Sequence, residues 1–308
     1  MFVARGIVVC LAFFAVMYGT LSLAIAVAWW SLQRLRQREP MSSAGLLFGL
    51  RIVPFAISVL VAVFLTFPSF WLMERRSLDE DAMTFVLAGC AFVLLSVGVS
   101  RAFRARARTI RAVTHWQAKS LAGNDTGDAS LSAVKGAPAL MLVGVCRPKV
   151  MFSDMAAAVL SDNELQVAIR HEVGHKHSWD NLKKLLINAT PFPGMSGIEN
   201  AWREAAELAA DNAAVRSRQD AIDLATALIK LSRSAKRWAE PELASGLACD
   251  SSAISLRVQR LLEWRTGGRK LQKAWLWTLL SLFVAAVIVS NYSTALVLTH
   301  RLTELLVP

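Results

Sequence analysis

The pattern His171-Glu172-Val173-Gly174-His175 stands in the second half of the chain. In an α-helix, residues i and i+4 lie on one face, so both imidazoles can reach a single ion. Neutral imidazole is a good ligand for Zn²⁺, and a site with three protein ligands keeps a fourth position for water. We therefore expect His171 and His175 to bind one zinc ion per chain. Glu172, beside that ion, is expected to be the catalytic base that takes a proton from water.

This pattern rarely arises by chance. The chain has 5 histidines among 308 residues, and a sequence of this composition would contain HExxH about 0.003 times. The alternative is a structural helix that carries these residues without binding metal, and the rarity of the pattern argues against it. His177 lies two residues beyond His175, is rotated off the ligand face, and is not expected to bind the metal.

A catalytic zinc needs a third protein ligand. The next predicted helix offers Glu199, Glu204 and Glu207. Glu207 and Asp211 stand at i and i+4 among alanines, and such small residues allow that face to approach the histidine helix closely. We expect Glu207 to be the third ligand and Asp211 to orient a ligand histidine. Glu204, one turn earlier, is the alternative ligand.

The helix that carries the histidines has a clear start. Ser161 and Glu164 form a capping box, in which each side chain satisfies a free backbone amide of the first turn. We expect this helix to run to about Ala189, where Pro191 and Pro193 stop it. Further elements are predicted around it: strands at residues 139–145 and 149–152, helices at about 199–218, 220–237 and 252–264, and loops at 122–138 and around Gly246.

The composition places these elements beside a membrane. The chain is 55% hydrophobic and 19% charged, with a mean hydropathy of +0.42, whereas soluble proteins have about 45–50% apolar and 25% charged residues. Because a membrane-spanning helix needs about 20 apolar residues, the pattern excludes a wholly soluble protein. The stretches that are long enough and free of charge are residues 6–30, 52–73, 82–100 and 274–299.

The first stretch has a second interpretation, a signal peptide cleaved after Ala24-Ile25-Ala26. Its 25 apolar residues exceed the roughly 7–15 of a signal peptide core, so we expect it to remain as a membrane span.

Loop charges predict the orientation. Five arginines follow the third span within residues 101–111, whereas the loop at residues 74–81 holds four acids and two arginines. Positive residues mark the cytoplasmic side, so we expect residues 101–273 in the cytoplasm and both termini outside. The four cysteines form no CxxC pair, which fits a reducing compartment.

The segments HEVGHKHSWD and AELAADNAAV resemble the membrane zinc peptidases of the BlaR/MecR antirepressor type, which are β-lactam sensor-transducers. In that family an aspartate follows HExxH by five residues, so the resemblance implies that Asp180 supports a ligand from outside the coordination shell. The segment Arg147-Pro148-Lys149-Val150 and Arg257 with Leu261-Leu262 are similar to the family's upstream strand and closing helix. The HtpX and CAAX-prenyl-protease type shares HExxH and ExxxD and is the close competitor.

The sequence and this resemblance together imply a mainly α-helical membrane protein with a cytoplasmic α+β zincin-like domain. Residues 1–100 hold three transmembrane helices, 101–273 form the zinc metallopeptidase domain, 274–299 are the fourth transmembrane helix and 300–308 a short extracytoplasmic tail. Residues 101 to about 121 are expected to continue the third span as a basic helix on the membrane surface. The sensor-transducers have a penicillin-binding domain after the fourth span; this sequence ends at Pro308, so we expect no antibiotic sensor.

The leading hypothesis is an integral inner-membrane zinc endopeptidase for cytoplasmic or membrane-associated proteins, such as a transcriptional repressor or a damaged membrane protein. Its role would be regulatory proteolysis or quality control. The expected partners are the lipid bilayer and a protein or peptide substrate, without nucleic acid. The formal charge of +11 is explained by juxtamembrane arginines that face anionic lipid. The alternative is a non-catalytic signal transducer that keeps the peptidase fold, against which the intact Glu172 argues.

The stabiliser of the transition state is less defined. Many zinc peptidases use a tyrosine or histidine, but Tyr18 and Tyr292, the two tyrosines of the chain, lie inside apolar spans. We therefore expect Arg257, or zinc alone, to supply this function. Arg51, at the cytoplasmic end of the second span, is expected to extend its charged group to the membrane surface.

Overall fold

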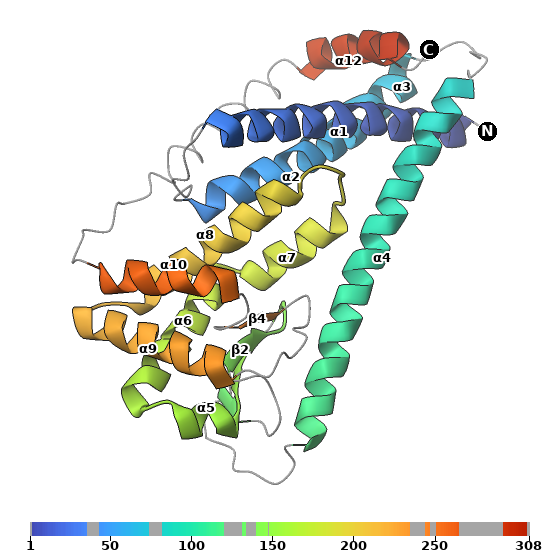
Figure 1. Ribbon diagram of the computed structural model, residues 1–308. Helices are drawn as coiled ribbons and strands as arrows, with labels where there is room; N and C mark the ends of the chain where they lie inside the picture. Colours follow the sequence, from blue (N-terminus) through green and yellow to red (C-terminus); the bar gives the residue numbers. More distant parts are fainter. Residues whose placement is uncertain are drawn as a thin grey trace.

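The computed structural model describes residues 2–35, 43–73, 82–119, 131–133, 140–146, 148–234, 244–246, 251–264 and 292–306. Most of these residues are helical, and one small β-sheet accompanies the helices (Figure 1). The expected mainly α-helical class with a small sheet is therefore observed.

Three helical segments are long and apolar enough to cross a membrane. They cover Phe2–Arg34, Ala44–Met73 and Ala82–Thr114, and each contains one of the first three expected spans. The first is α1 (Phe2–Leu35), the second runs through α2 (Ala44–Val61), the π-helical turn η1 (Ala62–Thr66) and α3 (Phe67–Met73), and the third is part of α4 (Ala82–Lys119). These segments indicate a membrane protein.

The expected fourth span, at residues 274–299, lies outside the described residues as far as residue 291. Its last residues begin helix α12 (Tyr292–Leu306), so the segment expected as a short tail is helical from residue 300 to 306. Helix α12 lies against α3 and the π-helical turn. Helices α1, α2, α3 and α12 and the first half of α4 form a helix bundle, and the two chain ends lie at the same end of it (Figure 1). In Figure 1 α12 lies above α1 and α2, whereas the sheet lies below them beside the lower half of α4.

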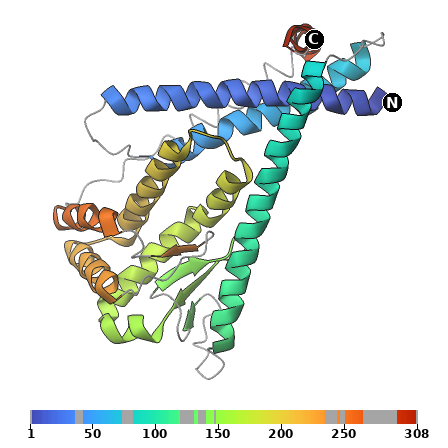
Figure 2. The same cartoon turned by 45° about the vertical axis from the view of Figure 1, so that its right-hand side comes forward.

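Helix α4 continues beyond the apolar stretch without a break. Its 38 residues measure about 57 Å at 1.5 Å per residue, and it runs from the bundle along the side of the sheet (Figure 2). Ala112 and Val113 pack against the buried residues Met141, Val143 and Met151 of the sheet. The expected helical continuation of the third span is therefore observed as far as Lys119, and near its end the helix packs on the sheet.

The sheet has the strand order β1-β3-β2-β4. Strands β2 (Leu140–Val143) and β3 (Lys149–Phe152) form the expected antiparallel pair. Strand β1 (Leu131–Ala133) adds to β3 in parallel, and β4 (Ala244–Gly246) adds to β2 in antiparallel orientation. Both added strands lie in segments expected as loops, because three-residue strands are defined by distant partners and carry no alternating pattern of their own.

Helices cover the sheet and one another to form the core of this domain. Its centre contains Leu142, Val150, Val167, Leu224 and Leu228, all at most 3% exposed. The helices are α5 (Asp154–Val159), α6 (Asp162–His177), α7 (Asp180–Ala189), α8 (Ser196–Ala214), α9 (Arg218–Ser234) and α10 (Ser251–Leu262).

One long helix was expected where the structure has α6 and α7. The helix breaks after His177, and Trp179 has a φ of 55°, in the left-handed region that glycine normally occupies at a helix end. The expectation of an uninterrupted helix to Ala189 is therefore wrong. The reason is the turn itself, which redirects the chain so that Asp180 faces His175.

Helices α7 and α8 form a hairpin whose tip, residues 190–195, reaches the helices that are long and apolar enough to cross a membrane. Ile187, Ile198 and Trp202 are buried in one cluster with Trp29 of α1 and Leu47 of α2. The helix that carries Glu207 and Asp211 therefore begins in contact with the bundle and ends in the domain core.

Candidate metal centre

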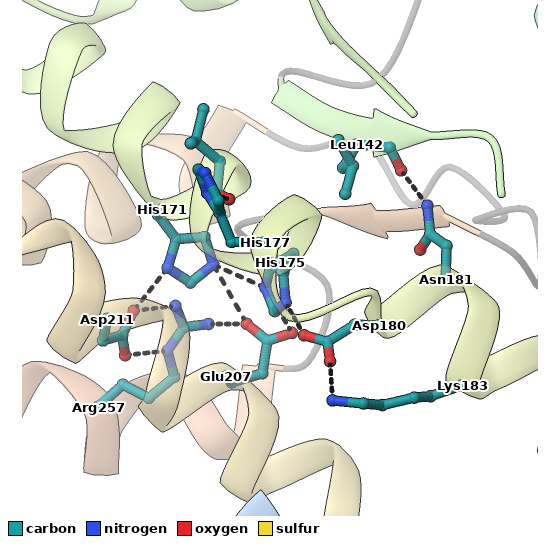
Figure 3. Close-up of polar contacts among 11 residues, drawn as sticks. Leu142, His171, His175, His177, Asp180, Asn181, Lys183, Glu207, Asp211 and Arg257 are labelled. Carbon is teal, nitrogen blue, oxygen red and sulfur yellow. Dashed lines mark hydrogen bonds and ion pairs between the residues drawn. The ribbon is translucent and has the colours of Figure 1, made fainter. Parts of the chain in front are cut away.

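Three side chains from two helices converge in the centre of the domain (Figure 3). Nε2 of His171 and Nε2 of His175 lie 3.1 Å apart, and each lies 3.5 Å from one carboxylate oxygen of Glu207. Within the part of the chain that the structure describes, these residues form a group that could hold a metal ion. The histidines come from α6 and Glu207 from α8, as expected.

Local sequence explains why these helices can meet. The expected capping box is observed, because Ser161 accepts a bond from the Glu164 amide and Glu164 accepts one from the Ser161 amide. Gly174 faces α8, where a Cβ would lie 3.3 Å from Cα of Ala210 and 3.4 Å from Cβ of Ala213. Small residues on both helices therefore allow the close approach that brings Glu207 to the histidines.

A carboxylate lies behind each imidazole. Nδ1 of His171 lies 2.9 Å from Oδ1 of Asp211, and Nδ1 of His175 lies 2.7 Å from Oδ2 of Asp180. A proton on Nδ1 satisfies each carboxylate and leaves the Nε2 lone pair of each ring directed at the centre. Asp211 and Asp180 thus lie in the positions in which they can orient the two histidines.

Arg257 of α10 joins Glu207 and Asp211 of α8. Its Nε and Nη2 donate to the two oxygens of Asp211 at 2.8 and 2.6 Å, and its Nη1 lies 3.0 Å from Oε2 of Glu207. The guanidinium is buried, and this paired geometry fixes both carboxylates. Arg257 therefore lies behind Glu207 as a holding group, rather than as a free donor facing the two histidines.

Glu172 lies between the two histidines in sequence and is 0% exposed. Its negative charge acts on His175 and on Arg257, since it contributes to raising the pKa of both groups. By comparison, 26% of the Glu207 side chain is exposed, so Glu207 is less buried than His171, His175 and Glu172.

The acidic residues dominate the electrostatics of this centre. Burial alone lowers the pKa of a histidine, but Glu207 and Asp180 outweigh it and raise the pKa of His175 to about 10. The hydrogen bond to Asp211 likewise raises the pKa of His171 against the effect of burial. Burial raises the pKa of Glu207, yet the two histidines and Arg257 hold it well below its usual range. The centre therefore attracts positive charge.

The donor set fits a zinc ion. Zn²⁺ binds nitrogen and oxygen at about 2.0–2.2 Å in a tetrahedron, which separates ligand atoms by about 3.3–3.5 Å. The observed separations of 3.1 and 3.5 Å are close to this value. When both rings are neutral, as metal ligands are, and carry their protons on the Nδ1 atoms beside the aspartates, the two Nε2 lone pairs face each other and repel unless a cation lies between them.

The charges of the surrounding side chains lead to the same conclusion. With both histidines neutral, as metal ligands are, four carboxylates outnumber two cations in this centre, which leaves two negative charges that a divalent ion would balance. The six residues are Glu172, Asp180, Glu207, Asp211, Arg257 and Lys183.

Other sequence candidates lie elsewhere. Glu204, the alternative ligand, is exposed on α8, and His177 is exposed with Nδ1 2.8 Å from the Val173 carbonyl oxygen. Glu199 pairs with Arg51 at 2.8 Å. Arg51 is 1% exposed, so the expectation that it extends to the membrane surface is wrong.

Two residues near the centre were not anticipated. Asn181 is buried, and its amide donates to the carbonyls of Leu142 at 3.2 Å and Gly144 at 2.9 Å, which ties α7 to the end of β2. Lys183 lies 3.3 Å from Oδ1 of Asp180. The sequence signal for Asn181 and Lys183 is their position shortly after Asp180. It indicates a place near the centre only once the helix break at Trp179 is known.

Comparison with known proteins does not assign this chain to a family. A scan against protein-family models gives no match, and a search of curated proteins finds none that matches the chain. The arrangement of the residues themselves therefore carries the functional argument.

Proposed function

We propose that the chain is an integral membrane zinc-dependent endopeptidase that hydrolyses peptide bonds of cytoplasmic or membrane-associated proteins. One observation carries the proposal: His171, His175 and Glu207 converge on one point, while the buried carboxylate of Glu172 lies on the same helix as both histidines. Three ligands with a neighbouring carboxylate that is not itself a ligand are the composition of a hydrolytic zinc site, in which a fourth position remains for water.

In this mechanism the protein side chains divide the work between positioning and proton transfer. A zinc ion bound here supplies a Lewis acid that polarises a carbonyl group and makes water a better proton donor. Glu172 accepts the proton of the attacking water and returns it to the leaving amine. Asp211 and Asp180 hold the two imidazoles so that Nε2 of each ring faces Glu207.

Arg257 has a holding role in this proposal. Its contacts with Asp211 and Glu207 keep the third ligand and one orienting carboxylate in place. They matter because burial of two carboxylates without a cation would be costly. Direct stabilisation of the transition state by Arg257 stays a prediction. In the structure, the nitrogen donors of Arg257 contact the carboxylates of Asp211 and Glu207.

The membrane context belongs to the proposal as well. We place the chain in the inner membrane with residues 101–273 in the cytoplasm and both termini outside, supported by the loop charges. The motif residues support kinship with the BlaR/MecR type of peptidase, with the HtpX type as the competitor. A reporter fused after Pro308 should be active only outside the cytoplasm; activity inside would contradict this orientation and with it the substrate class.

Metal content and cleavage test the function. The purified protein should contain one zinc per chain and cleave an unstructured protein such as casein. Glu172→Gln should keep the zinc and lose cleavage by at least about 10²–10⁴-fold, the contribution of general acid–base catalysis. Glu204→Gln, an exposed change on α8, is the matched control and should retain both properties.

Two results would contradict the proposal. If the parent lacks zinc, the site is not a metal centre. If the parent holds zinc but cleaves nothing, and Glu172→Gln signals in cells as the parent does, the chain is a signal transducer that keeps the peptidase fold.

A further inference from the structure

A buried polar contact joins the α7–α8 hairpin to the membrane-spanning helices. Arg51 of α2 donates through Nε to Glu199 of α8 at 2.8 Å. Its Nη1 donates to Oγ1 of Thr190 at 3.3 Å, and its Nη2 donates to the Thr190 carbonyl. Tyr18 of α1 donates to the carbonyls of Thr190 at 3.0 Å and Pro191 at 3.2 Å. Two membrane helices therefore hold the end of α7 and the start of α8.

The tip of the hairpin is packed among residues of the apolar spans. Phe192 contacts the ring of Tyr18 with 5.4 Å between ring centroids. It belongs to a cluster with Phe14 of α1, Phe55 of α2 and Ala91 of α4, which lie in the three different segments that can cross a membrane. The tip thus occupies the space between these helices.

Both arms of the hairpin approach the bundle closely. A Cβ at Gly98 of α4 would overlap the carbonyl oxygen of Ala189, the last residue of α7. A Cβ at Gly197 of α8 would lie 3.0 Å from Nε1 of Trp29 of α1. The absence of side chains at these two positions lets the backbones meet.

The polar groups of this contact satisfy one another's hydrogen bonds and charges. The last carbonyls of a helix have no partner within the helix, and unsatisfied carbonyls among apolar spans are costly. Arg51 supplies donors and a positive charge at the end of α7, where the helix dipole favours a cation. Glu199 in turn balances the buried guanidinium, which is otherwise expensive to remove from water.

The same contact lies at one end of the two helices that complete the metal centre. Thr190 follows the end of α7, and Asp180, which orients His175, is at its start. Glu199 and Glu207 are eight residues apart on α8, or about 12 Å. By contrast, α6, which carries both histidines, packs on α8, α9 and the sheet. Both histidines thus lie on a helix whose main contacts are within the domain, whereas Glu207 lies on a helix that contacts both the domain and the bundle.

We propose that Arg51 is a positioning residue for the metal centre, acting through Glu199 and Thr190. It holds the hairpin against the membrane-spanning helices and so sets the position of Glu207 relative to His171 and His175. The inference rests on the proposed function for its biological meaning: a shift of α2 against the domain would change the geometry of the zinc ligands. Regulation of the centre would thus come from the membrane side.

Metal binding by the full-length protein in detergent tests the inference. Two conservative variants weaken the contact without adding charge: Arg51→Lys loses the forked donors, and Tyr18→Phe loses one hydroxyl. We expect Arg51→Lys to weaken Zn²⁺ binding, measured by competition with a chelator, by about 5–150-fold. Tyr18→Phe should act in the same direction with a smaller effect. The visible absorption of Co²⁺-loaded protein, which reports ligand geometry, should change in both.

A third variant tests the route through Glu199. Glu199→Gln should weaken Zn²⁺ binding as Arg51→Lys does, and the double variant should lose less than the product of the two single losses, because both remove one interaction. Arg34→Lys is the control: Arg34 lies on α1 over the ring of Trp30, and its exchange should leave Zn²⁺ affinity and the Co²⁺ spectrum unchanged.

The inference is overturned if Arg51→Lys and Tyr18→Phe match the parent in Zn²⁺ affinity and Co²⁺ spectrum. A lower melting temperature with unchanged metal binding also overturns it, because Arg51 would then support only the fold. Independent, multiplicative losses in the double variant exclude Glu199 as the route. None of these readouts involves cleavage, so a zinc-binding protein that cleaves no peptide would contradict the proposed function and leave the role of Arg51 standing.

Discussion

Nδ1 of His175 lies 2.7 Å from Oδ2 of Asp180, although a continuous helix would turn these two residues to different faces. Residues five apart on an α-helix are separated by about 140° around its axis. The left-handed conformation of Trp179 ends α6 and lets α7 begin in a new direction. The break therefore brings the Asp180 carboxylate back to the ring of His175 at the candidate metal centre.

Removing the Asp180 carboxylate should weaken metal binding while the domain remains folded. We expect Asp180→Ala to lower Zn²⁺ affinity by about 10–100-fold, the usual effect of losing the partner of a ligand histidine. Competition with a chelator measures the change. Asp162→Asn, an exposed change in the first turn of α6, is the control, and equal affinities of Asp180→Ala and parent would contradict the assigned role.

Arg257→Gln should destabilise the protein more without metal than with it. The substitution leaves Asp211 and Glu207 buried without their cation, which costs about 3–5 kcal/mol in comparable buried pairs. Bound zinc would restore part of the missing positive charge. Melting temperatures with zinc and with a chelator measure this difference. Arg260→Gln, at an exposed position of the same helix, should show no such zinc dependence, and the same response in both variants would refute the argument.

Gly174 should tolerate alanine better than valine. An added Cβ meets Ala210 at 3.3 Å, so Gly174→Ala requires a shift of a few tenths of an ångström, whereas Gly174→Val drives α6 and α8 apart. We expect Gly174→Val to lower stability by about 1–3 kcal/mol and to weaken zinc binding more than Gly174→Ala. Gln166→Val, on the exposed face of α6, controls for the β-branched residue. Unchanged zinc affinity in Gly174→Val would show that helix spacing does not set the ligand geometry.

Asp220 should contribute stability that is lost in acid. Burial raises the pKa of Asp220, but the Arg170 guanidinium and the amides of Arg216 and Ser217 lower it below its ordinary value. The unfolded chain then binds more protons, so the contribution is present above about pH 3.9. It is lost as the pH falls through the lower folded pKa.

Asp220→Asn should therefore be less stable than the parent at neutral pH, by about 1–3 kcal/mol for a hydrogen-bonded charge. The difference should shrink below about pH 4, as thermal or denaturant unfolding at a series of pH values would reveal. Asp223→Asn, whose carboxylate contacts Gln219, is the control. A constant difference from pH 2 to 7 would rule out this linkage.

The parts of the centre that depend on local sequence could be predicted. The capping box at Ser161 and Glu164 needs a single helical turn, and the spacing of His171 and His175 defines one helix face. The pair Glu207 and Asp211 follows the same rule. The spacing alone therefore allowed these residues to be named as candidates without knowledge of their positions in space.

The parts of the centre that depend on distant partners could not be predicted from the sequence. A bulky residue such as Trp179 in a left-handed conformation is disfavoured locally, so its sequence predicts a continuing helix. An arginine next to an apolar span, such as Arg51, is expected to lie at the surface. Its partners Thr190 and Glu199 follow 139 and 148 residues later, so the sequence near Arg51 gives no sign of them. Arg257 could be singled out, but its bonds to Asp211 depend on how α10 packs against α8.

The hairpin tip has a consequence for how the protein is made. Tyr18 and Thr190 meet across 172 positions of the chain, and such remote contacts form late in folding. During synthesis, α1, α2 and the apolar part of α4 emerge first and can enter the bilayer before α8 exists. The helices that surround Phe192 are thus synthesised before the segment that carries it. A nascent chain that fails to insert would lack this support for Glu207, so maturation of the proposed metal centre would be tied to correct delivery to the membrane.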